Sequence, residues 1–311
     1  MTAPHTGGAG SATEGRLVVV STPIGNLGDL SARAVEVLTS ADAIACEDTR
    51  HTRRLLSAKG IPGGGRLVAV HQHNEDEAAA RLVERCLAGQ VVALVSDAGT
   101  PGISDPGQRV VAAAVAGGVR VEAVPGASAA LAALVVSGLP TERFCVEGFL
   151  PRKGAARRTR LAEFAVEPRT AVIYESPRRM VATLADLIGV CGPERLVSVS
   201  RELTKLYEET FRGTLVEASA WLGRLAAAGS SGPKGEFVIV IGGVPADRTD
   251  ADPAGVEAED RARDLAAAVA RHLAGGMRTK DAAAAAATET GARKADAYAV
   301  ALRLGQRDRS V

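Results

Sequence analysis

The sequence contains few aromatic residues and few cysteines. Aromatic side chains make up 3% of the 311 residues, so alanine, glycine and valine must fill most core positions. The cysteines, Cys46, Cys86, Cys145 and Cys191, are far apart and form no Cys-x-x-Cys motif. This spacing argues against a disulfide framework or a cysteine metal site. It predicts lone core thiols in a reducing compartment.

Long apolar runs and a secretion signal are also missing. No apolar run approaches the length of a membrane span, and the first residues lack the basic start and apolar middle of a signal peptide. We therefore expect a soluble, cytoplasmic protein that does not contact membranes.

Neither sign of charge dominates the chain. The 37 basic and 36 acidic residues leave a formal net charge of +1, so affinity for nucleic acid requires a local basic patch. Hydrophobic residues (46%) and charged residues (23%) occur in globular proportions, and the length allows two medium domains and a small module.

Two common nucleotide-binding motifs are absent from the first glycine-containing loop. Residues 21–30 read Ser-Thr-Pro-Ile-Gly-Asn-Leu-Gly-Asp-Leu, which matches neither Gly-x-Gly-x-x-Gly nor Gly-x-x-x-x-Gly-Lys-Ser/Thr. A nicotinamide dehydrogenase or a P-loop protein is therefore a weak interpretation.

The clearest candidate for a ligand loop is residues 96–107. The loop follows an apolar run over residues 91–95 that predicts a buried parallel strand, and it holds three glycines and two prolines. Open α/β sheets bind ligands beyond the carboxyl ends of their strands, so we expect this loop to contact a ligand. The alternative is a tight connection in which Asp105 caps the next helix.

Polar loops follow three other predicted strands. Strands over residues 43–46, 67–70 and 119–124 lead into Glu-Asp-Thr-Arg-His (47–51), His-Gln-His-Asn-Glu (71–75) and Pro-Gly-Ala-Ser-Ala (125–129). Ser128 is placed to cap a helix over residues 129–136. His71 and His73 lack an evident third metal ligand, so a polar cleft rim is preferred. The repeated strand–loop–helix order predicts a parallel sheet covered on both faces, in an α/β domain over residues 16–140.

The predicted strands are spaced differently in the second half of the chain. Strands lie closer together over residues 141–243, which predicts an α+β domain with a mixed sheet. Residues 152–160 contain five basic side chains and no acidic one, which favours a phosphate-contacting loop over a solvated helix face.

The ends of the chain complete the expected organisation. Residues 1–15 lack periodicity and predict a disordered tail. Residues 244–260 form an acidic linker, and residues 261–311 predict three helices, over 261–274, 280–290 and 293–304. Two of them around a glycine turn are like a helix-turn-helix that contacts nucleic acid; a helical cap is the alternative.

Eight segments in the same order resemble the ribosomal RNA small subunit methyltransferase I family. They are residues 21–27, 47–50, 71–75, 96–107, 125–129, 175–179, 201–205 and 234–236. The resemblance implies the tetrapyrrole-methylase fold: two α/β domains with S-adenosylmethionine in the cleft between them, followed by a helix-turn-helix extension. It also implies a homodimer that methylates the ribose 2′-oxygen of a cytidine, position 1402 of 16S rRNA, in the small ribosomal subunit.

The resemblance also implies where the cofactor binds. The expected contacts come from three strand-end loops: Pro23, Asp97, Ala98, Gly99, Ile103, Ser128 and Ala129. In-line methyl transfer to a hydroxyl depends on alignment and on a group that accepts the proton, and it needs no metal.

On the acceptor side the sequence leaves the choice of base open. Glu47 and Asp48 are carboxylate candidates, and Lys205 is a candidate if it is desolvated beside another cation. The side chains expected to contact RNA phosphates are Arg50, Arg152, Lys153, Arg157, Arg158, Arg160, Arg178 and Arg201.

Two other functions stay open at this point. A tetrapyrrole-precursor methyltransferase of the same fold is disfavoured by the Glu-Asp-Thr-Arg motif and by the C-terminal helices. A non-catalytic RNA-binding protein would leave the four elaborate strand-end loops unexplained.

Overall fold

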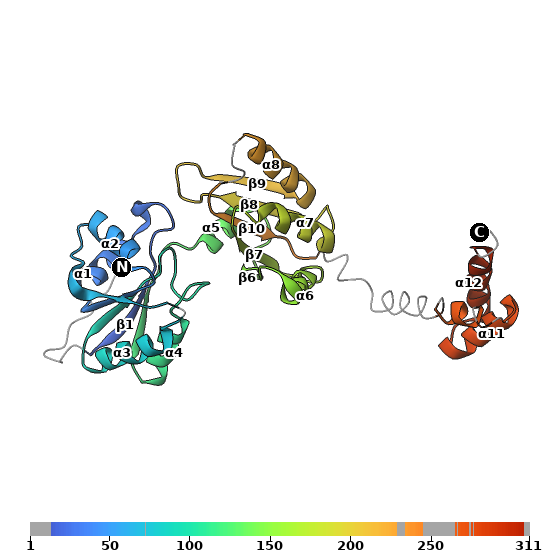
Figure 1. The fold of residues 1–311 in the computed structure, drawn as a ribbon, viewed down its shortest axis with the longest axis horizontal. Helices are drawn as coiled ribbons and strands as arrows, with labels where there is room; N and C mark the ends of the chain where they lie inside the picture. Colours follow the sequence, from blue (N-terminus) through green and yellow to red (C-terminus); the bar gives the residue numbers. More distant parts are fainter. Residues whose placement is uncertain are drawn as a thin grey trace, which may run out of the picture. The chain divides into compact units, whose positions relative to one another are not determined.

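A computed structural model describes residues 14–307 except 72, 229–233, 245–264, 266, 274 and 276. The chain divides into a larger unit that ends at Gly243 and a smaller unit that starts at Val244 (Figure 1). The predicted tail, apart from Glu14 and Gly15, and the predicted acidic linker, apart from Val244, lie outside the described residues.

The larger unit begins with a five-stranded sheet in the order β3-β2-β4-β1-β5. Its strands are β1 (Arg16–Val20), β2 (Ala43–Cys46), β3 (Leu67–Ala69), β4 (Val91–Leu94) and β5 (Arg120–Val124). All four pairings are parallel, so the carboxyl ends of the strands meet at one edge. The predicted parallel sheet is confirmed.

Helices cover both faces of this sheet, as Figure 1 shows. Helices α1 (Ala32–Ser40) and α2 (Thr49–Ala58) pack on one face through Leu38 and Leu56. Helices α3 (Glu75–Leu87) and α4 (Gln108–Ala116) pack on the other face through Leu82 and Val110. Such double coverage explains why the strands are apolar on both sides. Two 3₁₀ turns, η1 (Leu27–Asp29) and η2 (Gly64–Arg66), lie in the connections.

The second sheet has the order β6-β7-β10-β8-β9. Its strands are β6 (Phe144–Phe149), β7 (Thr170–Glu175), β8 (Leu196–Arg201), β9 (Glu209–Thr214) and β10 (Phe237–Ile241). Only β6 and β7 are parallel, so the predicted mixed sheet is confirmed. One face is covered by α6 (Gly154–Phe164), α7 (Met180–Cys191) and α8 (Leu215–Ala228), and the other by α5 (Ala129–Val136).

In each of two helices a carboxylate fixes the first turn. Helix α2 starts at Thr49, inside the segment 47–51 that was expected to be a polar loop, because the Asp48 carboxylate accepts the backbone N–H of Arg50 at 2.7 Å and caps the helix. Helix α4 starts at Gln108, and Asp105 does not cap it. The buried Glu75 carboxylate, from α3, instead accepts the backbone N–H groups of Gly107 (2.8 Å) and Arg109 (3.0 Å).

The smaller unit is helical in its described part. Residues 267–273, α11 (Thr279–Thr290) and α12 (Lys294–Arg307) share a core made largely of alanine. Gly291 ends α11 in the left-handed conformation (φ 70°), which leaves a three-residue turn before α12. Two of the three predicted helices are therefore present. The first lies partly outside the described residues, and a helix-turn-helix role stays a prediction. None of the described helices is long and apolar enough to span a lipid bilayer.

Candidate functional site

Hydrogen bonds join the loops that follow the three adjacent strands β4, β1 and β5. Thr22 and Gly99 exchange backbone hydrogen bonds of 2.8 and 3.1 Å as an isolated antiparallel bridge. The Thr100 hydroxyl bonds the Ser21 hydroxyl at 2.9 Å and donates to the Ala127 carbonyl at 3.3 Å. The three loops therefore form one surface at the carboxyl edge of the sheet, which is where open α/β sheets bind ligands.

A cavity of about 370 Å³ lies beside these loops. Its walls contain apolar side chains, two carboxylates and three basic side chains from both halves of the larger unit, namely Pro23, Ile24, Gly25, Leu27, His51, Arg54, Leu55, Ala58, Asp97, Ala98, Lys205 and Glu236. Its size and mixed lining are typical of a small-molecule site.

The residues expected to bind the cofactor divide into two groups. Pro23, Asp97 and Ala98 line the cavity, whereas the other four do not. Those four are Gly99, which pairs with the loop after β1; the half-exposed Ile103; Ser128, which caps α5; and Ala129, the first residue of α5.

A cluster of carboxylates lies where the neighbouring strands β2 and β4 end. Burial raises the pKa of Glu47, and the charges of Asp97, Asp105 and Asp48 raise it further. Burial also raises the pKa of Asp105, and Asp97 adds to that shift. Asp97 itself accepts the backbone N–H of Asp48 at 3.1 Å, which ties the two strand ends together.

The two carboxylate candidates for the base have different environments. The Asp48 carboxylate is exposed, and the hydrogen bond from the Arg50 backbone lowers its pKa below the usual value. Glu47 is half-buried and its pKa is raised, so it has the higher proton affinity of the two. Of the two carboxylates, Glu47 is therefore the stronger proton acceptor.

A lysine acts as a base when its pKa is lowered, and the surroundings of Lys205 have the opposite effect. Its ammonium lies 2.9 Å from the Glu202 carboxylate and 3.1 Å from the Glu236 carboxylate. Burial lowers the pKa of Lys205, but the two carboxylates outweigh burial and raise it overall. Its stem lies against Gly25, where a Cβ atom would collide with it. Lys205 is therefore a charged group whose stem lies against the first loop.

Known proteins resemble this chain over most of its length. Residues 16–219 match the family of Tetrapyrrole (Corrin/Porphyrin) Methylases. Ribosomal RNA small subunit methyltransferase I of Xylella fastidiosa is 52% identical over 231 residues, which are 74% of this chain and 82% of the relative. The protein of that name from Mycobacterium tuberculosis is 45% identical over 270 residues, 87% and 88% of the two chains.

The chain belongs to the ribosomal RNA small subunit methyltransferase I family. Among solved structures, the methyltransferase CobJ aligns with a TM-score of 0.54 at 21% identity, over 74% of this chain and 95% of that chain. At this identity the likeness concerns the fold alone, and it confirms the expected tetrapyrrole-methylase fold.

The cavity of this family member suits S-adenosylmethionine. A carboxylate such as Asp97 suits the sulfonium and ammonium groups of the cofactor, and Lys205 or Arg54 suits its carboxylate. Apolar side chains such as Ile24 and Leu55 suit the adenine ring. In the described residues no group of three His, Cys, Asp or Glu side chains could hold a metal ion, and the His71 and His73 ring centres lie 6.2 Å apart.

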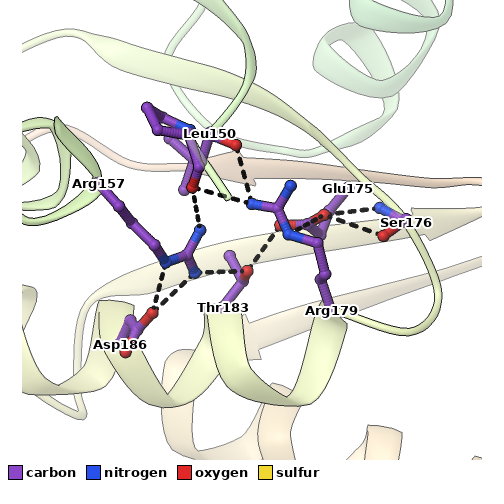
Figure 2. A network of polar contacts seen from close by, with 8 residues as sticks. Leu150, Arg157, Glu175, Ser176, Arg179, Thr183 and Asp186 are labelled. Carbon is purple, nitrogen blue, oxygen red and sulfur yellow. Dashed lines mark hydrogen bonds and ion pairs between the residues drawn. The ribbon is translucent and has the colours of Figure 1, made fainter. Parts of the chain in front are cut away.

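Arg157 was expected to bind RNA, but its side chain is turned into the protein and bonded there (Figure 2). The side chain is buried and donates to Asp186 (2.7 and 3.0 Å), to the Thr183 hydroxyl (2.9 Å) and to the Pro151 carbonyl (3.1 Å). Thr183 in turn donates to the buried Glu175 at 2.6 Å. The basic run gave no sign of this, because Asp186 and Thr183 lie on α7, more than twenty residues further along the chain, and that helix was not predicted.

The rest of this network holds the end of β6 (Figure 2). Arg179 lies 3.3 Å from the Glu175 carboxylate and donates to the Leu150 carbonyl at 2.9 Å. Both arginines therefore fix the backbone at Leu150 and Pro151, immediately before Arg152.

Two other expected RNA contacts are ion-paired. Arg160 lies 2.7 Å from Glu147 and also pairs with Glu163, and Arg201 lies 3.1 Å from Glu209. The others are exposed and have no ion pair among the described residues: Arg50, Arg152, Lys153, Arg158 and Arg178. Sequence reasoning missed His51, Arg54 and Glu236 as cavity residues. A correct start for α2 would have placed Arg54 one turn beyond Arg50.

Arg157→Ala should destabilise the protein, whereas Arg158→Ala, at the exposed neighbouring position, should not. Arg157→Ala removes charge-assisted hydrogen bonds worth about 2 kcal/mol, and the midpoint of thermal unfolding should fall by about 5 °C. Arg158→Ala should leave the midpoint within about 1 °C, because surface substitutions change stability by about 0.5 kcal/mol or less. Thermal melts followed by circular dichroism measure both. Equal midpoints for the two variants would contradict a structural role for Arg157.

Proposed function

We propose that this protein methylates the ribose 2′-oxygen of a cytidine in the 16S rRNA of the small ribosomal subunit, with S-adenosylmethionine as donor. The observation that carries the proposal is the 45–52% identity with relatives named ribosomal RNA small subunit methyltransferase I over most of the chain. The site supports it with a cavity that suits the cofactor and carboxylates beside it. Such an enzyme acts where subunits assemble, in the cytoplasm.

The chemistry requires alignment and removal of one proton. S-Adenosylmethionine supplies a methyl carbon bonded to a positively charged sulfur. The ribose oxygen would take this methyl group from the sulfur, which would leave as a neutral thioether, and the hydroxyl proton would pass to a base of the protein. The loops that Thr22 and Gly99 join would fix the cofactor in line with the acceptor, which supplies much of the rate.

We assign Glu47 as the base that accepts the proton of the ribose hydroxyl. Its carboxylate lies in the cluster with Asp97, which lines the cavity, and its raised pKa makes it a stronger acceptor than an exposed glutamate. Lys205 remains protonated between its two carboxylates and would orient a negative group of the cofactor or the RNA.

A transfer assay tests the proposed function. Assembled small subunits lacking this methyl group, naked 16S rRNA and a tetrapyrrole precursor would each be incubated with labelled S-adenosylmethionine and the protein. We expect label on RNA at one cytidine 2′-oxygen, mapped by its resistance to alkaline cleavage. Label on the tetrapyrrole alone would overturn the function and leave the fold. Cofactor binding without label on any acceptor would contradict both enzymatic functions.

Glu47→Gln should greatly reduce the rate of methyl transfer, whereas Asp48→Asn should leave it almost unchanged. Loss of the base should reduce transfer by about 10²–10⁴-fold in Glu47→Gln, while Asp48→Asn should stay within a few fold because asparagine also caps helices. In the wild type, kcat/KM should fall as the pH drops through the pKa of Glu47, since the protonated acid cannot accept a proton. The midpoint should lie above the usual glutamate value, and the limb should be missing in Glu47→Gln. Full turnover in Glu47→Gln would refute the assignment, with cofactor binding by calorimetry as the control.

We also propose that the protein forms a homodimer through α5. Every residue of this helix is apolar, yet Leu131 is 49% and Val135 71% exposed. On the same side of the second sheet, Phe144 and Val146 of the edge strand β6 are also exposed. A helix that is apolar all round is normally buried, and a second copy of the chain would cover this surface.

Charge on α5 should therefore separate the subunits. Leu131→Glu with Val135→Glu should convert a dimer into a monomer, as measured by sedimentation velocity. Leu87→Glu with Val115→Glu places two charges at equally exposed apolar positions on α3 and α4 and should leave the dimer intact. A monomeric wild type would contradict the proposal outright.

A further inference from the structure

Helix α2 exposes a row of arginines beside the cavity. Arg50, Arg53 and Arg54 line a shallow hollow together with Ser57 and Ala58, and we call these five residues the α2 arginine face. Their spacing along the helix places them on one side, opposite the side that packs on the sheet. All five are exposed.

The three arginines of this face have no ion-pair partner in the described residues, unlike several other exposed arginines of the chain. None of the three lies within ion-pair distance of a carboxylate in the described part of the chain, whereas Arg81 and Arg109 each do. Helix α2 contains no acidic residue. Because three neighbouring cations repel one another, this arrangement is best stabilised by an anion from outside the chain.

The position of the row at the start of a helix strengthens this argument. Arg50 lies in the first turn of α2, where the helix dipole favours negative charge and disfavours positive charge. The Asp48 carboxylate already caps this end, and the dipole and the guanidinium groups together favour a further anion, such as a phosphate, beside it.

The α2 arginine face is continuous with the cavity. Arg54 and Ala58 line both the hollow and the cavity that contains Asp97 and Lys205. An extended polyanion bound along the hollow would therefore reach the cavity at the Arg54 end. A small anion would have no need of a row this long.

We propose that the α2 arginine face binds the phosphodiester backbone of the RNA strand that flanks the methylated nucleotide. This inference rests on the proposed function and adds the path of the substrate: the strand runs along α2 and presents one ribose at the cavity. Phosphates hold the strand in position here, and the bases are not read.

The proposal can be tested by removing the charges of Arg50 and Arg53, the two arginines that do not line the cavity. Arg53→Gln and the double variant Arg50→Gln/Arg53→Gln change residues that line only the hollow. The matched control, Arg81→Gln/Arg224→Gln, removes two exposed positive charges from α3 and α8. Binding of unmethylated small subunits would be measured by filter retention at a series of salt concentrations, together with the KM for methyl transfer.

We expect the double variant to bind about tenfold more weakly at moderate salt and to raise the KM by a similar factor. The slope of log affinity against log salt should become shallower by about 0.7 for each phosphate that the variant no longer neutralises. The control should match the wild type. Circular dichroism melts check folding, and if the double variant does not fold, Arg53→Gln with half the change in slope carries the test.

The outcomes separate this inference from the proposed function. If the wild type methylates subunits and the variants keep the affinity and salt slope of the control, the RNA path along α2 is wrong and the proposed function stands. If the wild type neither binds nor methylates subunits, both fall.

Discussion

The site depends on the backbone pairing of Thr22 with Gly99. This pairing joins the loops after β1 and β4, which are neighbours in the sheet although more than seventy residues separate them in sequence. Gly99 takes part with a φ of 83°, a conformation that a side chain would strain. At the other end of the second loop, the buried Glu75 holds Gly107 at the start of α4. With both ends fixed, the loop presents Asp97 and Ala98 to the cavity in a set position.

Charge is segregated around this fixed loop. Carboxylates gather where β2 and β4 end, arginines cover the outside of α2, and Lys205 lies between two glutamates at the boundary with the second sheet. The net charge of +1 hides this pattern, because opposite local fields cancel over the whole chain. A cationic donor and an anionic acceptor can therefore bind side by side, each against groups of the opposite sign.

Much of this arrangement follows from local sequence signals. Apolar runs that end in glycine- and proline-rich loops predicted the parallel sheet, and Ser128 caps α5 as expected. What sequence reasoning missed depends on partners distant in sequence. A run of five basic residues predicts a surface patch, but Asp186 and Thr183 draw Arg157 into the interior. Asp48 was a candidate base in the sequence, and only the structure shows that its carboxylate accepts the backbone N–H of Arg50 and caps α2.

The fold by itself does not determine the acceptor. The methyltransferase CobJ shares this fold at 21% identity, and related folds commonly serve different substrates. Because the fold is shared, differences in substrate must come from the residues that surround the strand-end loops. Here β2 leads directly from Glu47 through the capping Asp48 into the arginines of α2. One helix cap therefore sets the distance between the proposed base and the proposed phosphate contacts. A shift of the α2 start by a single residue would rotate the arginines by about 100° and move them away from the cavity.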